Sequence, residues 1–371
     1  MERILENVET RYFDLGEFIL ESGATIDDVE VAYETYGQLN ADGNNAILIT
    51  HAFSGDAHAA GWHDYAEKSG WWDNMIGPGK AFDTNRYFVI CSNVLGGCAG
   101  TAGPSLLNSA TDRPYGSDFP QITIGDMVAV QERLIDFLGI DKLLSVAGGS
   151  MGGMQALQWL AAYSDRVHSA IPIATAMQHT PQQIAFNHIQ RQAIMADPNW
   201  QDGDYCGTGQ SPNRGLAIAR MLGHATYTSD EVLQRKFGRR KTDGIFEVES
   251  YLDYKGDQFA KCFDANSYIY LTRAMDNFDV SGSFETAEHD SAKILVVSFS
   301  SDWLYPPWQS EETATELRSL GHDIEHVVIE STAGHDSFLL ENEVQARVIR
   351  DFLARIALDL ASCEKVPSLL D

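Results

Sequence analysis

A single serine stands between two pairs of glycines in the segment SVAGGSMGGMQALQW, residues 145–159. The residues before it read as a buried strand and the apolar residues after it have helical spacing, so we expect a sharp strand-to-helix turn at Ser150. The pattern G-x-S-x-G is typical of a nucleophile elbow, in which glycines tolerate a strained backbone and leave the serine hydroxyl exposed. The alternative is a phosphate-binding loop, but the G-x-G-x-x-G register and the P-loop lysine are missing. We therefore predict that Ser150 is a nucleophile.

A nucleophilic serine needs a base, and the base needs a carboxylate that orients it. His335, in STAGHDSFLL, follows a late apolar run and precedes a helical pattern, and Asp302, in SFSSDWLYPP, follows the preceding apolar run. Read alone, Asp302 could equally be a turn former and His335 a surface loop residue. The chain order Ser150, Asp302, His335 is that of the α/β-hydrolases, so the ordered trio favours a catalytic triad.

The segment HAFSGDAHAAGWHD, residues 51–64, gathers five potential metal ligands: His51, Asp56, His58, His63 and Asp64. A metal site is the alternative here, but the spacing fits no compact zinc pattern, and we expect no metal. The segment follows an apolar run at the place where α/β-hydrolases provide one oxyanion donor. We predict that the backbone N–H groups of Phe53 and Met151 form the oxyanion hole.

These residues need a scaffold that brings them together. Short apolar, β-branched runs predict buried strands at 29–37, 46–52, 86–92, 143–149, 169–175, 294–300 and 325–331. Helical spacing predicts helices at 122–140, 151–163, 309–320 and 338–361, the first of them capped by Thr123 with Asp126. Strands that alternate with helices indicate an α/β protein with a mostly parallel central sheet and helices on both faces, as in the α/β-hydrolase fold.

One connection is far longer than an ordinary crossover between strands. About 110 residues, from roughly 180 to 290, separate two predicted strands, and they contain helical patterns at 182–195 and 265–278. We interpret this segment as an inserted helical lid over the active site. The predicted organisation is a core formed by residues 1–180 and 291–371, with the lid at 181–290.

Charge and composition exclude several classes of partner. The chain of 371 residues has 26 basic and 53 acidic side chains, a formal net charge of −27, which disfavours nucleic acid and anionic membranes. No apolar run approaches the ~20 residues of a membrane helix, and no secretory signal is evident. Five scattered cysteines without a CxxC pair argue against a disulfide framework or zinc ribbon. We expect a cytoplasmic location.

Longer motifs make the sequence similar to one family. It resembles the homoserine O-acetyltransferases in HAFSGDAHAAG, GWWDNMIGPGKAFDTNRYFVICSNVLGGC, GGSMGGMQALQW, FGRR, FEVESYL, DANSYIYLTRAMD, SSDWLYPP and GHDSFLLE, which together span nearly the whole chain. The resemblance implies that Ser150 is acylated and that Asp302 and His335 complete the triad. It also implies acetyl-CoA and L-homoserine as substrates, a ping-pong mechanism in methionine biosynthesis, no cofactor beyond the co-substrate, and a homodimer.

The same resemblance assigns residues to the substrates. Arg191 and Asp336 match positions that bind homoserine, whose carboxylate and ammonium require opposite charges. Leu304 matches a position where succinyl-using relatives carry arginine, so we expect it to favour acetyl donors. Ala99 departs from the family pattern, in which a bulkier residue is expected, and leaves the details of the acyl pocket open. Serine O-acyltransferase, homoserine O-succinyltransferase and an esterase with the same triad remain alternatives.

Overall fold

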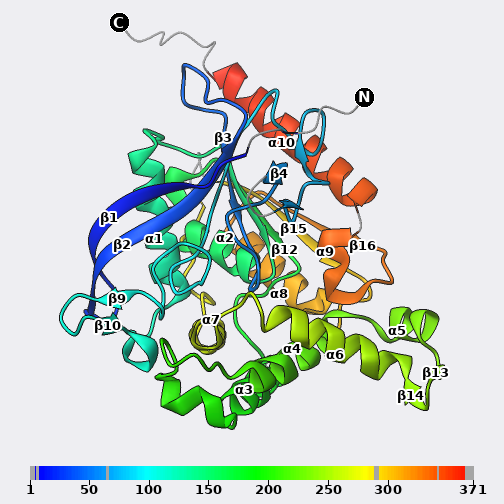
Figure 1. Cartoon of the computed structure of the whole chain (residues 1–371). Helices are drawn as coiled ribbons and strands as arrows, with labels where there is room; N and C mark the ends of the chain where they lie inside the picture. The colour runs from blue at the N-terminus through cyan, green and yellow to red at the C-terminus, as the bar shows by residue number, and fades with distance from the viewer. Residues whose placement is uncertain (1–4, 6–7, 64–66, 288–291, 341, 364–371) are drawn as a thin grey trace, which may run out of the picture.

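A twisted eight-stranded sheet forms the centre of the computed structural model, which describes residues 5, 8–63, 67–287, 292–340 and 342–363 (Figure 1). Its strands, in spatial order, are β1 (Arg11–Ile19), β2 (Thr25–Tyr36), β8 (Phe88–Ser92), β3 (Ala46–Thr50), β11 (Ser145–Gly149), β12 (Ser169–Ile173), β15 (Lys293–Phe299) and β16 (Ile324–Ile329). From β8 to β16 all neighbours are parallel, while β1–β2 and β2–β8 are antiparallel. The predicted α/β-hydrolase fold is thus confirmed.

The middle strands are buried on both faces, which explains their continuous apolar character. Along β3, Leu48 belongs to one apolar core cluster, while Ile47 and Ile49 belong to another on the opposite face. All seven strands expected from the sequence are present. Strand β1 was missed because its side chains are mostly exposed or half-exposed and form no apolar run.

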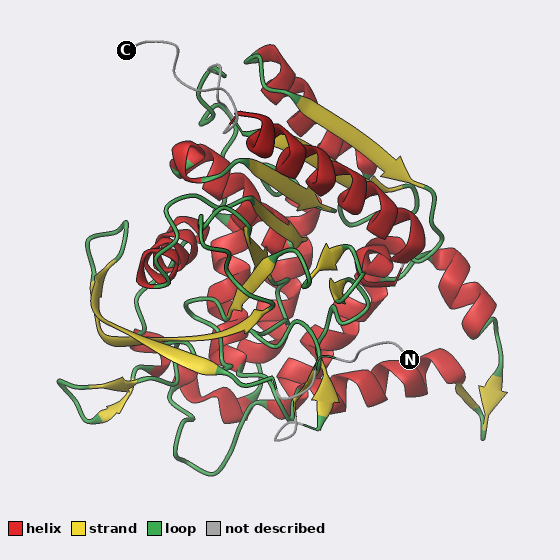
Figure 2. Cartoon of the chain, turned by 90° about the horizontal axis from the view of Figure 1, so that it is seen from above, coloured by secondary structure: helices red, strands yellow, loops and turns green. Residues whose placement is uncertain are grey.

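Helices cover both faces of this sheet (Figure 2). α1 (Ile124–Phe137), α2 (Met151–Ala162) and α8 (Pro307–Ser319) contribute to the first core cluster, and α10 (Asn342–Cys363) contributes to the second. The predicted cap of α1 is confirmed, because Thr123 and Asp126 form a reciprocal capping box. The helix predicted at 338–361 is divided into α9 (Ser337–Leu340) and α10.

In the described part of the chain, five α-helices follow β12 and precede β15 in the sequence, and they lie on the side of the sheet where the green to yellow ribbon runs in Figure 1. They are α3 (Pro181–Met195), α4 (Asn213–Tyr227), α5 (Asp230–Lys236), α6 (Glu247–Phe259) and α7 (Ala265–Asp276). They reach loops that follow core strands, since Gln183 of α3 donates to the Leu304 carbonyl and Arg220 of α4 donates to Ser54. The division into 1–180, 181–290 and 291–371 stays a prediction, and its second boundary falls among residues outside the described ranges.

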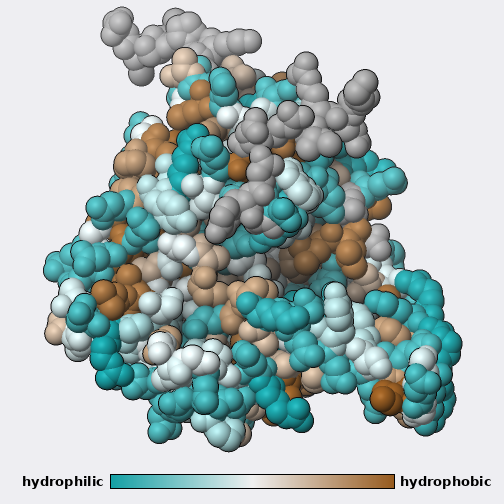
Figure 3. All heavy atoms as spheres, in the orientation of Figure 1, coloured by the Kyte–Doolittle hydropathy of each residue, from teal (hydrophilic) through white to brown (hydrophobic). Residues whose placement is uncertain are grey.

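Short strands pair in the loops outside the central sheet. They are β4 (Trp62–His63), β5 (Lys68–Ser69), β6 (Ile76–Gly77), β7 (Phe82–Asp83), β9 (Leu107–Asn108), β10 (Arg113–Pro114), β13 (Lys241–Thr242) and β14 (Ile245–Phe246). The face of the molecule seen in Figure 3 is mainly hydrophilic, with scattered apolar spots. Among the described residues, no helix combines the length and apolar character needed to span a bilayer.

Candidate active site

The turn between β11 and α2 holds Ser150 in a strained conformation, with φ 59° and ψ −122°. Such positive φ values are rare for residues other than glycine and cost free energy that the surroundings must offset. The flanking glycines are required by close packing: a Cβ on Gly148 would lie 2.2 Å from Thr50 Oγ1, and one on Gly152 would lie 2.1 Å from the Thr50 carbonyl oxygen. The glycines therefore let the elbow pack directly against the end of β3.

The loops after β15 and β16 bring the two predicted partners to this serine. His335 Nε2 lies 2.9 Å from Ser150 Oγ, and His335 Nδ1 lies 2.7 Å from Asp302 Oδ2. Because an ionised carboxylate only accepts hydrogen bonds, Nδ1 carries the proton and Nε2 faces the serine as an acceptor. All three side chains are buried, and Asp302 is itself held by the backbone N–H groups of Leu304 and Tyr305. This arrangement can remove the proton from Ser150.

The two N–H groups predicted to form the oxyanion hole belong to Met151 and Phe53. Met151 is the first residue of α2, so its N–H has no acceptor within the helix and lies at the positive end of the helix dipole. Phe53 lies in the buried loop after β3, and its ring packs edge-on against Tyr268, with centroids 4.6 Å apart. The oxyanion role of these two N–H groups stays a prediction.

The histidines of the 51–64 segment are occupied by protein partners. His51 Nε2 accepts from the Val94 N–H, and its Nδ1 lies 2.8 Å from the Ala52 carbonyl, while burial lowers the pKa of His51. His58 Nδ1 pairs with the buried carboxylate of Glu34 at 2.9 Å. Asp64 lies outside the described residues. Among the residues that are described, no three His, Cys, Asp or Glu side chains are grouped so as to hold a metal ion.

The two predicted homoserine ligands lie in different environments. Arg191 Nη1 is 2.7 Å from Asp276 Oδ2 in an ion pair with little exposure, so its charge is already compensated. Asp336 adjoins His335, and burial raises the pKa of its carboxyl, while the charges of His335 and Arg220 oppose this rise. The structure therefore gives Arg191 another partner and brings a different arginine into the electrostatic environment of Asp336.

Sequence reasoning missed that second arginine. Arg220 comes from α4, its guanidinium lies 4.4 Å from the ring centre of Phe259, and its Nη1 donates to Ser54 Oγ at 3.2 Å. It lines a cavity of about 210 Å³ together with Phe53 and Ala99. Within the described part of the chain, no carboxylate forms an ion pair with it. Nothing in the spacing around Arg220 distinguishes it from an ordinary helix residue, so only the fold reveals it.

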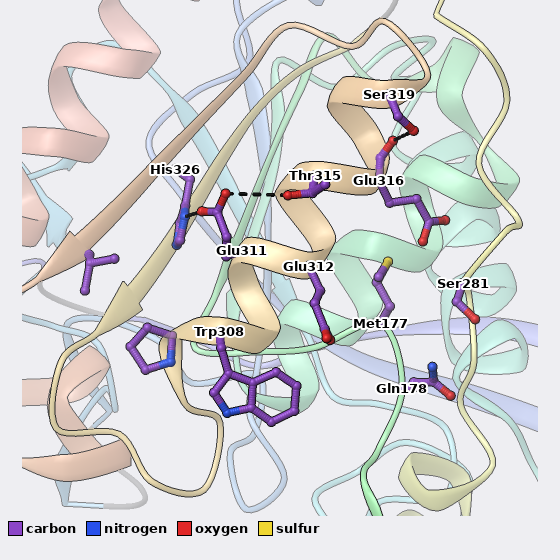
Figure 4. A pocket seen from close by; sticks show the side chains of 12 residues that line it. Met177, Gln178, Ser281, Trp308, Glu311, Glu312, Thr315, Glu316, Ser319 and His326 are labelled. Carbon is purple, nitrogen blue, oxygen red and sulfur yellow. Dashed lines mark hydrogen bonds and ion pairs between the residues drawn. The ribbon is translucent and has the colours of Figure 1, made fainter.

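A larger cavity of about 790 Å³ lies elsewhere, between α8, β16 and the segments that contain Met177 and Ser281 (Figure 4). Trp308, Glu311, Glu312 and Glu316 line it, and the carboxylate of Glu311 pairs with His326 at 2.7 Å. None of the triad residues lines this cavity, and three carboxylates would repel an anionic coenzyme. We therefore locate the chemistry at the elbow rather than in this cavity.

Comparisons with known proteins agree with this fold. Residues 45–342 match the model of the α/β hydrolase fold family. A homoserine O-acetyltransferase of Methanohalobium evestigatum is 55% identical over 361 residues, covering 94% of this chain and 74% of the relative. One from Leptospira biflexa is 52% identical over 355 residues, covering 94% of both chains. This chain belongs to the homoserine O-acetyltransferase family.

Solved structures place this family beside esterases. The homoserine O-acetyltransferase from Bacillus anthracis has a TM-score of 0.87 at 32% identity and covers 94% of this chain and 98% of its own. Esterase E22 has a TM-score of 0.86 at 34% identity, covering 94% of this chain and 100% of its own. The family resemblance inferred from the motifs is confirmed, and the same fold carries two related chemistries.

Leu304 is predicted to favour acetyl over succinyl donors, and it lies two residues after the triad aspartate. Its side chain is partly buried against the core. Its N–H donates to Asp302 Oδ1 at 3.0 Å, and its carbonyl accepts from Gln183 Nε2 at 2.9 Å. The backbone of this residue is thus fixed from both the core and α3, while its role in donor selection stays a prediction.

Proposed function

We propose that this chain transfers the acetyl group of acetyl-CoA to the hydroxyl of L-homoserine through an acetylated Ser150. The observation that carries the proposal is the buried Ser150–His335–Asp302 hydrogen-bonded chain in a member of this family. Such a chain activates a serine towards acyl groups, and the thioester of acetyl-CoA is an acyl donor.

In the first half-reaction, His335 Nε2 takes the proton of Ser150, and Oγ attacks the thioester carbonyl carbon. The N–H groups of Phe53 and Met151 stabilise the negative oxygen that forms. The C–S bond then breaks, and the departing thiolate of coenzyme A receives the proton from His335. The products are acetyl-Ser150 and free coenzyme A.

In the second half-reaction, the homoserine hydroxyl occupies the place that the thiol has left. His335 removes its proton, its oxygen attacks the acetyl carbon, and the same N–H groups stabilise the oxyanion. Collapse breaks the bond to Ser150 Oγ, which regains the proton from His335. O-acetylhomoserine leaves and the enzyme returns to its starting state.

Homoserine, the acyl acceptor, carries a carboxylate and an ammonium group, so its binding site needs a positive and a negative side chain beside the triad. Asp336 adjoins His335 and can pair with the ammonium group once its carboxyl is ionised. Arg220 supports the carboxylate role better than Arg191, because Arg191 is already paired with Asp276. We accordingly assign the homoserine carboxylate to Arg220 and the ammonium to Asp336.

The remaining expectations form part of this proposal. The family resemblance supports a cytoplasmic homodimer in methionine biosynthesis, with acetyl-CoA as co-substrate and no separate cofactor or metal. The net charge of −27 supports the exclusion of nucleic acid as a partner.

The discriminating experiment is to incubate the protein with acetyl-CoA and an equimolar mixture of homoserine and serine, and to identify the products by mass spectrometry. We expect O-acetylhomoserine as the main product. Acetyl-serine as the main product would make the chain a serine acyltransferase. Free acetate formed at the same rate with and without the amino acids would make it an esterase, the second candidate that the likeness to esterase E22 favours.

A donor comparison tests the role of Leu304. A succinyl group would bring a carboxylate into the acyl pocket, and burying that charge without a cation costs several kcal/mol, whereas an acetyl group gains apolar contact. We expect kcat/KM for acetyl-CoA to exceed that for succinyl-CoA by at least about 100-fold, equivalent to ~2.7 kcal/mol. Leu304→Arg should narrow this ratio by slowing acetyl transfer and raising succinyl transfer. Equal use of the two donors by the wild type would identify a succinyltransferase.

A further inference from the structure

Three cations of the helices α4, α5 and α6 are not neutralised by a carboxylate (Figure 1). They are Arg220 of α4, Lys236 at the end of α5 and Lys255 of α6, and within the described residues none of them forms an ion pair. By contrast, Arg240, four residues after Lys236, pairs with Glu247 at 2.9 Å. In a chain with 53 acidic and 26 basic side chains, a group of three unpaired cations needs an explanation.

The ring of Tyr251 on α6 holds two of these cations without cancelling their charge. Lys236 Nζ lies 4.2 Å from the centre of the Tyr251 ring, and Lys255 Nζ lies 5.8 Å from it. An aromatic face attracts a cation, but unlike a carboxylate it leaves the net charge and the ammonium N–H groups free for another partner. Two lysines over one ring therefore suit a ligand with several negative oxygens.

The neighbouring His224 shows that the local potential is positive. Its ring lies 5.9 Å from that of Tyr251, its side chain is buried, and its Nδ1 has no hydrogen-bond partner among the described residues. Burial, and then the charges of the three cations, lower the pKa of His224 to about 3, so this ring is neutral at pH 7. An anion bound here would be attracted by three positive charges at one place.

This group lies on the side of α4 that leads to the catalytic histidine. Arg220, His224 and Tyr227 recur at helical spacing along α4 and so share one face. The Tyr227 ring lies 6.2 Å from that of His224 and 6.0 Å from that of His335. A row of rings thus separates the two lysines from the triad. A substrate that reaches both must be long, with its negative charges remote from its reacting group.

We propose that Lys236 and Lys255 bind the phosphates of coenzyme A, while the pantetheine arm spans the distance to Ser150. Of the two substrates in the proposed function, only acetyl-CoA carries anionic groups far from the reacting carbon, because homoserine is short. Unpaired lysines also offset the repulsion between a polyanionic coenzyme and a chain of net charge −27. This inference rests on the proposed function, because it concerns the acyl donor of that reaction.

The test compares acetyl-CoA with S-acetylpantetheine, which has the same thioester and arm but no phosphate. In Lys236→Met/Lys255→Met, kcat/KM for acetyl-CoA should fall about 10-fold, mainly through KM, because two partly exposed charge contacts are lost. The variant should use S-acetylpantetheine as well as the wild type does. Added salt should lower kcat/KM for acetyl-CoA in the wild type and have much less effect in the double variant.

Arg214→Met/Lys261→Met is the matched control, because it removes the same two charges from positions that line a separate cavity beside Asp253 and Asp257. This control should keep the wild-type kcat/KM for both donors. Unchanged use of acetyl-CoA by the Lys236 and Lys255 variant overturns the proposal. An equal loss with both donors, or an equal loss of acetyl-CoA use in the control, also overturns it.

The wild type separates this inference from the proposed function. If it acetylates Ser150 from both donors with the same kcat/KM, the phosphates contribute nothing and this inference alone is refuted. If neither thioester acetylates Ser150, the proposed function is refuted as well. Circular dichroism of the two double variants checks that they fold, which we expect because none of the four side chains belongs to the apolar core.

Discussion

Ser150→Ala is expected to reduce acetyl transfer about a million-fold, the scale observed when a serine triad is disabled as a unit. The reason is geometric: His335 Nε2 lies 2.9 Å from Ser150 Oγ, and without that oxygen no covalent intermediate can form. Wild-type protein incubated with acetyl-CoA alone should release coenzyme A in a burst. Peptide mass spectrometry should then find one acetyl group, on the peptide that contains Ser150.

A second buried serine provides the matched control. Ser169, on β12, donates its hydroxyl to the Leu144 carbonyl at 2.7 Å, away from the triad, so Ser169→Ala should keep the burst and the acetylated peptide. Acetyl groups on another peptide, or normal turnover by Ser150→Ala, would contradict the assignment of the nucleophile.

The central sheet and the triad order were predictable because both leave local signals in the sequence. A strand buried on both faces must be almost entirely apolar, as β3 and β11 are. The elbow at Ser150 needs glycines at fixed distances along the chain. The structure also gives a reason for the other two glycines of the segment, since Gly149 packs against the Phe338 ring and Gly153 against Thr175, contacts that join segments far apart in sequence.

Residues whose roles depend on tertiary partners were beyond sequence reasoning. Arg191 has the right charge for a carboxylate ligand, but its pairing with Asp276 depends on how α3 packs against α7. Arg220 carries no spacing signal, and its position results from the long insertion folding back onto the strand ends. Strand β1 was missed because its side chains are mostly exposed or half-exposed and form no apolar run, whereas the other edge strand, β16, contains one.

Arg220→Ala is expected to lower kcat/KM for homoserine by roughly 30-fold to several-thousand-fold, because losing a charged partner from a desolvated site costs about 2–5 kcal/mol. The burst of coenzyme A release should persist, since the first half-reaction contains no amino acid. Rapid-quench measurement of the burst and of deacetylation by homoserine separates these two steps. Arg214→Ala removes the same charge from an exposed position of α4 and should leave both steps unchanged.

The variant Arg191→Ala decides whether Arg191 or Arg220 binds the homoserine carboxylate. If Arg191 serves only as the ion-pair partner of Asp276, as the contacts indicate, Arg191→Ala should leave the dependence of deacetylation on homoserine concentration nearly unchanged. If Arg191 holds the homoserine carboxylate, as the family resemblance implied, its loss should spare the burst and impair deacetylation. A normal homoserine dependence in Arg220→Ala, together with a weakened one in Arg191→Ala, would return the carboxylate to Arg191 and exclude the arrangement with Arg220.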